Sequence, residues 1–231
     1  MDKKHPLYFT IHGHFYQPPR ENPWTGVIEN QPSARPNHDW NDRIASQCYS
    51  PNSASRILSP HGHIVDIVNN YEYMSFNMGP TLMGWIRTNT PDTYRRIQEA
   101  DKKSIERLGH GNAIAQVYNH IIMPLASEQD KRTQIRWGIE DFKFHFGRMP
   151  EAMWLAETAI NFETVVELIK AGIKFTILSP TQADSFRKFG DEEWTGCSNT
   201  DIDTTRPYRV YPRDKDGNLV CDGYLDVFYY N

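Results

Sequence analysis

Short apolar segments alternate with helical patterns along this chain, and that alternation limits the folds it can adopt. Most of these segments are rich in β-branched and aromatic residues and predict strands buried on both faces, which is typical of a parallel sheet. The six predicted strands cover residues 7–15, 71–77, 113–119, 152–157, 175–179 and 225–230. Because helices separate the strands, we expect an α/β fold with right-handed crossovers, either a barrel or a doubly wound sheet.

Helix start and stop signals lie between the predicted strands. Three helices have such signals at both ends and are predicted over 91–109, 127–147 and 161–172. Each begins at a proline or a polar capping residue and stops at a glycine. The helical spacing of four apolar residues predicts one more helix just before the second strand: Ile64, Ile67, Val68 and Tyr71.

Two long stretches interrupt this rhythm and are predicted to be loop insertions, over about 16–59 and 191–223. Loops of this length in a compact domain are often functional lids, and we expect the first one to cover the site. Within the second, residues 208–212 and the turn signal at 215–218 predict a hairpin.

Charge, hydropathy and cysteine content exclude several classes of protein. The 231 residues carry 25 Lys and Arg against 29 Asp and Glu, a net charge of −4, which argues against a nucleic acid partner held by bulk charge. No apolar run approaches about 20 residues, so no membrane span is predicted. The N-terminus lacks the apolar core of a secretory signal, and the three cysteines form no CxxC pair. We therefore expect a cytoplasmic protein without a disulfide framework.

Polar and aromatic side chains stand at the ends of four predicted strands. In parallel α/β folds the carboxyl ends of the strands converge, and the reactive groups lie there. One polar strand end means little, but four in register indicate a site. We expect it to contain the side chains at these ends: His12, His14, Tyr16, Asn77, Asn119, His120, Trp154 and Glu157.

The residue types at these ends leave several kinds of chemistry open. His12 and His14 point to the same side of a strand, because strand side chains alternate. They could bind a metal if a third ligand such as His120 or Glu157 joined them, donate hydrogen bonds to a polar substrate, or be a satisfied structural pair. Glu157 is either a helix-start residue or a catalytic carboxylate. Aromatic residues, 13% of the chain, either fill the core or stack on flat ligands such as sugar rings.

Three segments resemble, in the right order, the motifs of glycoside hydrolase family 57. They are HGHFYQPPRENPW at 12–24, GHGNAIAQVYNHIIMPLA at 109–126 and MWLAETA at 153–159. This family includes α-amylase-like, 4-α-glucanotransferase-like and branching-enzyme-like members. The resemblance implies a (β/α)7-type barrel and a retaining mechanism without a metal or other cofactor.

The resemblance also implies roles for individual residues. Glu157 matches the nucleophile of the family. Six of the other strand-end residues are expected to bind substrate: His12, His14, Tyr16, Asn119, His120 and Trp154. The aspartate that serves the family as general acid/base has no matching motif in this chain. The resemblance therefore implies that residues 1–231 are the N-terminal portion of a barrel catalytic domain, with the first five or six strands, and that this portion alone is inactive.

We accordingly expect a retaining glycoside hydrolase or glycosyltransferase that acts on an α-linked glucan or a related oligosaccharide. Two alternatives stay open: a metal-dependent polysaccharide deacetylase or zinc mannosidase on a related barrel, and a non-catalytic glycan-binding module. If the final strand were unpaired, its open edge would favour self-association.

Overall fold

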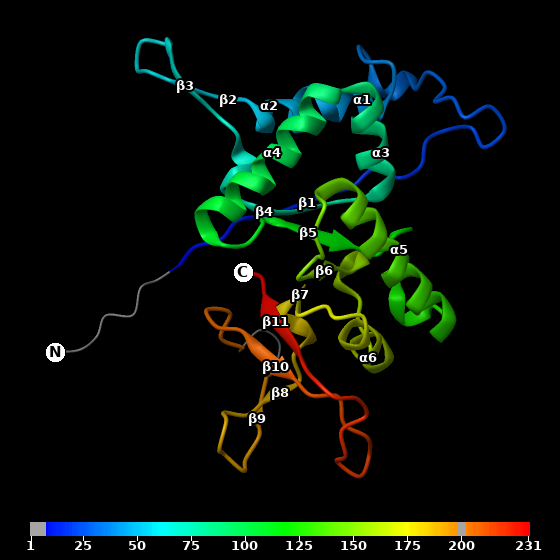
Figure 1. Cartoon of the computed structure of the whole chain (residues 1–231), viewed down its shortest axis with the longest axis vertical. Coiled ribbons are helices and arrows are strands. Elements are labelled where there is room, and N and C mark those ends of the chain that lie inside the picture. Colours follow the sequence, from blue (N-terminus) through cyan, green and yellow to red (C-terminus); the bar gives the residue numbers. More distant parts are fainter. Residues whose placement is uncertain (1–7, 198–201) are drawn as a thin grey trace. The chain divides into compact units, whose positions relative to one another are not determined.

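The chain is described by a computed structural model over residues 8–197 and 202–231 (Figure 1). Contacts between Cα atoms divide it into two compact units, Met1–Ala113 and Ile114–Asn231. Each unit contains parallel strands and the helices that follow them. The first predicted strand starts at residue 7, which lies outside the described residues.

A parallel strand pair forms the centre of the first unit. β1 (His12–Phe15) pairs with β4 (Ser75–Met78), and the helices α3 (Pro80–Asn89) and α4 (Pro91–Leu108) follow β4. As predicted, α4 begins at a proline and stops at a glycine in the left-handed conformation. Large side chains that are fully buried in this unit include Tyr71, Phe76, Leu82, Met83, Ile86 and Ile97.

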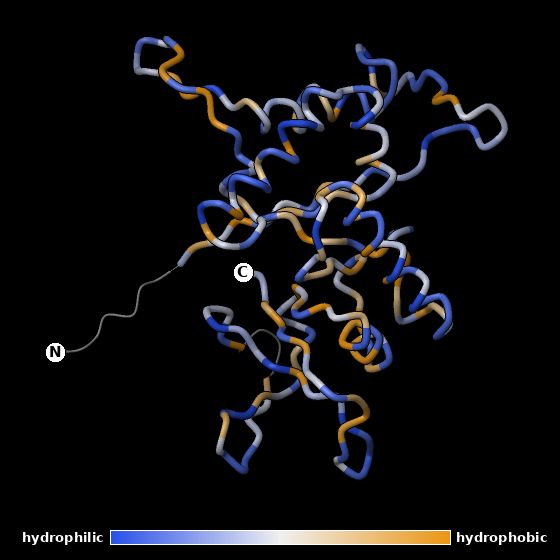
Figure 2. The backbone as a smooth tube through the Cα atoms, viewed as in Figure 1, coloured by the Kyte–Doolittle hydropathy of each residue, from blue (hydrophilic) through white to orange (hydrophobic). Residues whose placement is uncertain are grey.

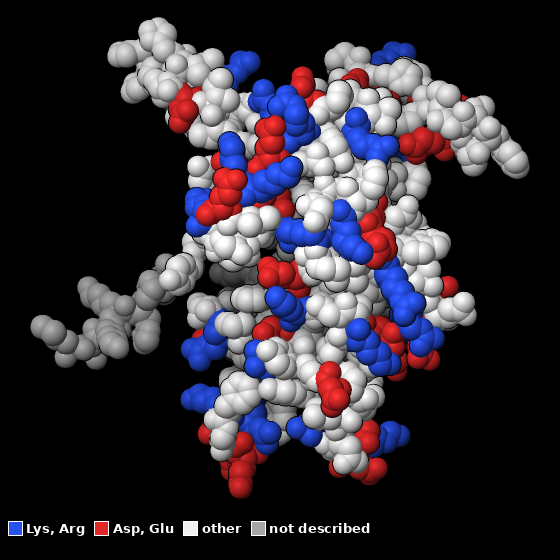
Figure 3. Space-filling view, viewed as in Figure 1, with Lys and Arg blue, Asp and Glu red and all other residues white. Residues whose placement is uncertain are grey.

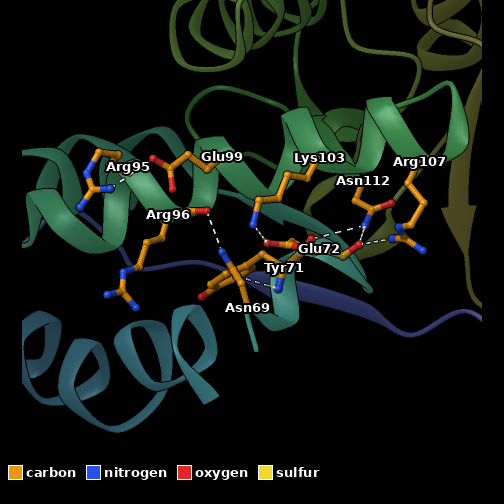
Figure 4. A network of polar contacts seen from close by, with 9 residues as sticks. All are labelled: Asn69, Tyr71, Glu72, Arg95, Arg96, Glu99, Lys103, Arg107 and Asn112. Carbon is orange, nitrogen blue, oxygen red and sulfur yellow. Dashed lines mark hydrogen bonds and ion pairs between the residues drawn. The ribbon is translucent and has the colours of Figure 1, made fainter. Parts of the chain in front are cut away.

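Polar contacts tie α4 to the short helix η3 (Asn70–Glu72), which lies just before β4 (Figure 4). Lys103 forms an ion pair of 2.7 Å with the Glu72 carboxylate. The Glu72 carbonyl accepts a hydrogen bond from Arg107 and another, of 2.8 Å, from the side chain of Asn112. These bonds hold the turn that leads into β4, and therefore help to set the direction of the β4 side chains.

The segment 16–59 is less irregular than the predicted loop. It contains the 3-10 helix η1 (Pro32–Ala34), α1 (Trp40–Ile44), the π-helix η2 (Ala45–Tyr49), α2 (Ser50–Ser53) and β2 (Ser55–Leu58). The helical run begins because the Asp39 side chain accepts a hydrogen bond from the backbone of Asp42. Whether this segment serves as a lid stays a prediction.

The helix predicted from Ile64 to Tyr71 is wrong. Residues Ile64–Val68 form the strand β3, which pairs antiparallel with β2. All but one of its residues are branched at Cβ, which favours a strand, and Gly62, with a φ of 79°, turns the chain between the two strands. Hydrophobic stretches mark the β2–β3 hairpin in Figure 2. The exposed apolar side chains of this hairpin are Ile57, Leu58, Ile64, Val65 and Ile67.

The second unit holds two further pairs of parallel strands. Its strands are β5 (Ala113–Gln116), which starts at the unit boundary, β6 (Met153–Trp154), β7 (Phe175–Leu178), β8 (Ser185–Phe186), β9 (Thr195–Gly196), β10 (Tyr208–Val210) and β11 (Leu225–Tyr229). β5 pairs with β6 and β7 pairs with β11, both in parallel, and a parallel bridge between Ala152 and Phe175 links the two pairs.

Two long helices of the second unit start and end close to the predicted positions. α5 (Glu128–Phe146) is capped by the side chain of Ser127 and is followed by Gly147 in the left-handed conformation. α6 (Phe162–Lys170) is capped by the side chain of Asn161 and ends two residues before Gly172. Three 3-10 turns complete the unit: η4 (Met123–Leu125), η5 (Ala156–Thr158) and η6 (Pro180–Gln182).

All six predicted strands are present, although each is shorter than predicted. The parallel α/β class is confirmed, but the strands of the described residues form no closed barrel. The final strand is not an open edge, because β11 lies between β7 and the antiparallel β10, which also confirms a hairpin in this region. Self-association stays a prediction, but an unpaired final strand is not a reason for it.

No helix within 8–197 and 202–231 is long and apolar enough to cross a membrane.

Charged side chains of both signs lie side by side on the face drawn in Figure 3. Ion pairs also form within single helices. On α4, Arg95 pairs with Glu99 over 3.2 Å, and on α5, Arg132 pairs with Glu128 over 3.1 Å. Such exposed pairs contribute little to stability, on the order of 0.5 kcal/mol each.

Candidate functional site

The predicted site residues fall on both units, so each group is described within its own unit. The first unit carries four of them, three on or just after β1 and one on β4: His12, His14, Tyr16 and Asn77. The second unit carries the other four, at or after the ends of β5 and β6: Asn119, His120, Trp154 and Glu157. His12 is the first residue of β1 and does not lie at its carboxyl end, whereas the other seven residues lie within the last two positions of a strand or within four residues after it.

His12 is held by two polar residues of β4. In the parallel register His12 lies opposite Ser75, and His14 lies opposite Asn77. The His12 Nδ1 is 3.0 Å from the Ser75 Oγ, and its Nε2 is 3.1 Å from the Asn77 Oδ1. Burial lowers the pKa of His12 to about 4, although the hydrogen bond that His12 donates to Asn77 acts in the opposite direction. His12 is therefore neutral at pH 7.

The same asparagine links the two imidazoles. Asn77 is fully buried, and its Nδ2 lies 2.9 Å from the Nδ1 of His14, closer than its Oδ1 at 3.2 Å. We assign the bonds in one direction: Ser75 donates to His12, His12 Nε2 donates to Asn77, and Asn77 donates to His14. This assignment places the His14 proton on Nε2.

The His14 ring is exposed and stacks on Tyr16. The two ring centroids are 6.3 Å apart and the planes differ by 5°. Burial raises the pKa of Tyr16, so this phenol stays protonated at neutral pH. The first unit thus carries an exposed imidazole beside an aromatic ring, and these are residue types that occur in sites for ligands with hydroxyl groups and flat apolar faces.

The low pKa of His12 predicts a pH dependence of stability. In the unfolded chain this imidazole has a pKa of about 6.5, compared with about 4 in the folded protein. Between these two pH values the unfolded state is protonated at His12 and the folded state is not, so the free energy of unfolding falls as the pH is lowered. Lowering the pH from 7 to 4.5 should therefore reduce the free energy of unfolding by about 2 kcal/mol more in the native protein than in a His12→Gln variant. Urea denaturation of both proteins at the two pH values measures this difference, and equal losses would contradict a neutral, buried His12.

Glu157 has a backbone conformation that non-glycine residues rarely adopt. Its φ and ψ are 54° and 23°, in the left-handed region. Across the described parts of the chain, the non-glycine residues with positive φ are His120, Glu157 and Thr158. Such conformations cost on the order of 1–3 kcal/mol and cluster at functional sites. Two of these three residues are predicted site residues, which is an observation independent of the sequence motifs.

The surroundings of Glu157 direct its carboxylate outward. Glu157 is exposed, whereas Ala156 and Thr158 on either side of it are buried. Trp154, at the end of β6, is half-buried. The two buried neighbours therefore anchor the loop, and the Glu157 carboxylate stays accessible to a ligand.

Asn119 and His120 occupy the loop after β5. The Asn119 backbone N–H donates over 2.7 Å to the buried side chain of Gln134 on α5, and its own side chain is exposed. The backbone N–H of His120 donates over 3.3 Å to the carbonyl of Val117, which closes a tight turn. The loop thus has a fixed backbone and presents two polar side chains.

Ser75 and Asn77 are contacts that sequence reasoning did not assign. The sequence places Asn77 at a strand end within the expected site but predicts no individual role for it, and Ser75 is not among the expected site residues. The signal was present, because Ser75 and Asn77 alternate along β4 as His12 and His14 do along β1. Within 8–197 and 202–231, no group of three or more His, Cys, Asp or Glu side chains could hold a metal ion.

Parallel strands that carry polar groups at their carboxyl ends define an α/β protein of the class that binds ligands at that edge of the sheet. The sequence matches glycosyl hydrolase family 57 over residues 5–225. The chain therefore belongs to this family, as the three motifs suggested.

Solved structures agree in fold. A 4-alpha-glucanotransferase from Thermococcus litoralis is 15% identical with a TM-score of 0.57, over 95% of this chain and 27% of that one. An alpha-amylase from Thermotoga maritima is 14% identical with a TM-score of 0.57, over 97% and 46%. A branching enzyme from Thermococcus kodakaraensis is 14% identical with a TM-score of 0.53, over 97% and 47%.

This chain spans less than half of the length of each of these three structures. At such low identity the likeness establishes the fold and no more. The comparison with curated proteins gives no match.

Proposed function

We propose that this chain is part of a retaining glycoside hydrolase or glycosyltransferase that acts on an α-linked glucan, with Glu157 as the nucleophile. The observation that carries the proposal is the exposed Glu157 carboxylate on a left-handed turn at the carboxyl end of β6, in a chain of glycosyl hydrolase family 57. Similar structures named as a glucanotransferase, an amylase and a branching enzyme support a glucan substrate. The (β/α)7-type barrel that the family resemblance implies is part of the same proposal.

The reaction requires two carboxyl groups. One Glu157 oxygen would form a bond to the anomeric carbon while the glycosidic C–O bond breaks and its electron pair moves to the leaving oxygen. A second carboxyl group, about 5–5.5 Å away in retaining enzymes, protonates that oxygen. Water or an acceptor sugar then displaces Glu157. Of these two groups, we assign only the nucleophile to this chain.

The neighbouring residues supply the kinds of contact that a sugar needs. Imidazole and amide groups can donate hydrogen bonds to hydroxyls, and aromatic faces can stack on sugar rings. We propose that six residues make such contacts with the substrate: His12, His14, Tyr16, Asn119, His120 and Trp154. We also propose that the protein acts in the cytoplasm, as the cysteine pattern of its sequence suggests.

Covalent trapping tests the proposal directly. A fluorinated α-glucosyl fluoride should label Glu157, because the ring fluorine slows breakdown of the glycosyl-enzyme and fluoride leaves without protonation. The labelling step therefore reports on the nucleophile, independently of the general acid. Peptide mapping of the natural full-length protein should find the label on Glu157.

Two other outcomes would contradict this assignment. A label on a different carboxylate would move the nucleophile elsewhere. Glucan binding without any label would favour a non-catalytic glycan-binding module.

A further inference from the structure

The turn that follows β7 is bonded to the loop that carries Glu157. Gln182 is the last residue of η6, and its Nε2 donates over 2.7 Å to the carbonyl of Thr158. In return, the Thr158 hydroxyl donates over 3.1 Å to the Oε1 of Gln182. The backbone N–H of Ser179 also donates to this Oε1, over 2.8 Å, which fixes the Gln182 side chain on its own turn.

The loop needs such support because two consecutive residues are strained. Glu157 and Thr158 both have a φ of 54°. A β-branched residue such as threonine is unusual at positive φ, since its side chain crowds the backbone there. The backbone bonds inside the loop, such as that from Thr158 to Leu155, join only near neighbours in sequence. Gln182 instead ties the loop to the end of a different strand.

We propose that Gln182 is a positioning residue for Glu157. By bonding both the carbonyl and the hydroxyl of Thr158, it holds the backbone dihedral angles of the loop and therefore the direction of the Glu157 carboxylate. Gln182 itself touches neither the nucleophile nor the reacting atoms in this role. The inference rests on the proposed function of Glu157, because positioning has meaning only if that carboxylate attacks a sugar.

Loss of these bonds should slow the chemical step rather than weaken binding. Without Gln182, the strained loop can relax toward commoner backbone conformations, and the carboxylate spends less time in line with the anomeric carbon. Small misplacements of reacting groups cost about 10²-fold in rate. We therefore expect Gln182→Leu to lower kcat on a maltooligosaccharide about 10- to 100-fold, with KM within a factor of about 3.

Two further variants test whether the bonds act as a unit. Thr158→Val removes the hydroxyl bond and keeps the carbonyl bond, so its kcat should lie between those of the native protein and Gln182→Leu. The double variant should be no slower than Gln182→Leu, since the shared bonds are already lost. Thr181→Val is the matched control: it loses the 2.9 Å bond to Ser179 on the same turn without touching Thr158, and should keep the native kcat.

Labelling by the fluorinated α-glucosyl fluoride separates positioning from damage to the fold. The positioning role predicts that Gln182→Leu is labelled on Glu157 to full stoichiometry, but about 10- to 100-fold more slowly. A native labelling rate, or a native rate on a reduced fraction of molecules, would overturn it. If Gln182→Leu fails to fold, Gln182→Glu replaces it, because it keeps the bonds that Oε1 accepts and loses only the donor to Thr158.

The same experiment keeps the two proposals distinct. Labelling of Glu157 in the native protein, with no effect of Gln182→Leu, overturns the positioning role alone. Absence of the label on Glu157 in the native protein overturns the proposed nucleophile, and the positioning role with it.

Discussion

Glu157→Gln is expected to abolish glycosyl transfer while leaving glucan binding intact. The amide has nearly the same size and can keep the same neighbours, but it lacks the anionic oxygen that must bond to the anomeric carbon. Because covalent catalysis divides one difficult step into two easier ones, loss of the nucleophile should lower kcat by at least about 10³-fold. Turnover of a maltooligosaccharide by the natural full-length protein measures the loss, and calorimetric titration measures binding.

The chain offers a matched control for this substitution. Glu163 is an exposed carboxylate in the first turn of α6, and Glu163→Gln should keep native turnover and binding. Native turnover in Glu157→Gln would refute the assignment of the nucleophile. Loss of binding together with turnover would indicate that Glu157 holds the substrate rather than attacks it.

The strands and helices could be predicted where local signals act alone. Apolar runs located all six predicted strands, and capping residues located α4, α5 and α6 to within a residue or two. The prediction failed at Ile64–Val68, where the spacing of a few apolar residues also fits a helical period. The β-branched residues and the turn at Gly62 favour a strand here. The sequence does not reveal it, because a hairpin with exposed apolar faces shows no alternation of polar and apolar residues.

The candidate site shows the same division between local and non-local information. That His12 and His14 share one side of a strand follows from strand geometry. Their link through Asn77 depends on the register between β1 and β4, which the sequence does not specify. The left-handed backbone of Glu157 and its support from Gln182 also depend on contacts between distant segments. Sequence motifs therefore predict which residues form the candidate site, and the structure shows the contacts that orient their side chains.

At Gly138 on α5, a contact with a distant segment reverses the effect on stability that the sequence alone predicts for an alanine substitution. A glycine inside a helix normally weakens it, so replacement by alanine should stabilise the helix by about 1 kcal/mol. In the structure Gly138 is buried, and a Cβ atom there would lie 2.1 Å from the carbonyl oxygen of Gln116 in β5. Glycine is thus required because the helix backbone rests directly on the strand backbone.

Gly138→Ala is therefore expected to destabilise the second unit by about 3 kcal/mol, at the upper end of the range for an overpacked core. The obstructing atom belongs to the backbone, so no side-chain rotation can relieve the clash, and α5 must move away from β5. Because Gln134 on the same helix bonds the backbone of Asn119, this movement should also disturb the loop after β5 and lower activity. Urea denaturation measures the loss of stability.

Gly84→Ala provides the opposite expectation from the same chemical change. Gly84 is an exposed glycine inside α3, and a Cβ there would meet nothing within 4 Å. Only the helix propensity should act, so this variant should gain about 0.5–1 kcal/mol. If Gly138→Ala were as stable as Gly84→Ala, the close approach of α5 to β5 would be refuted, and with it the account of how this helix fixes the loop that carries Asn119 and His120.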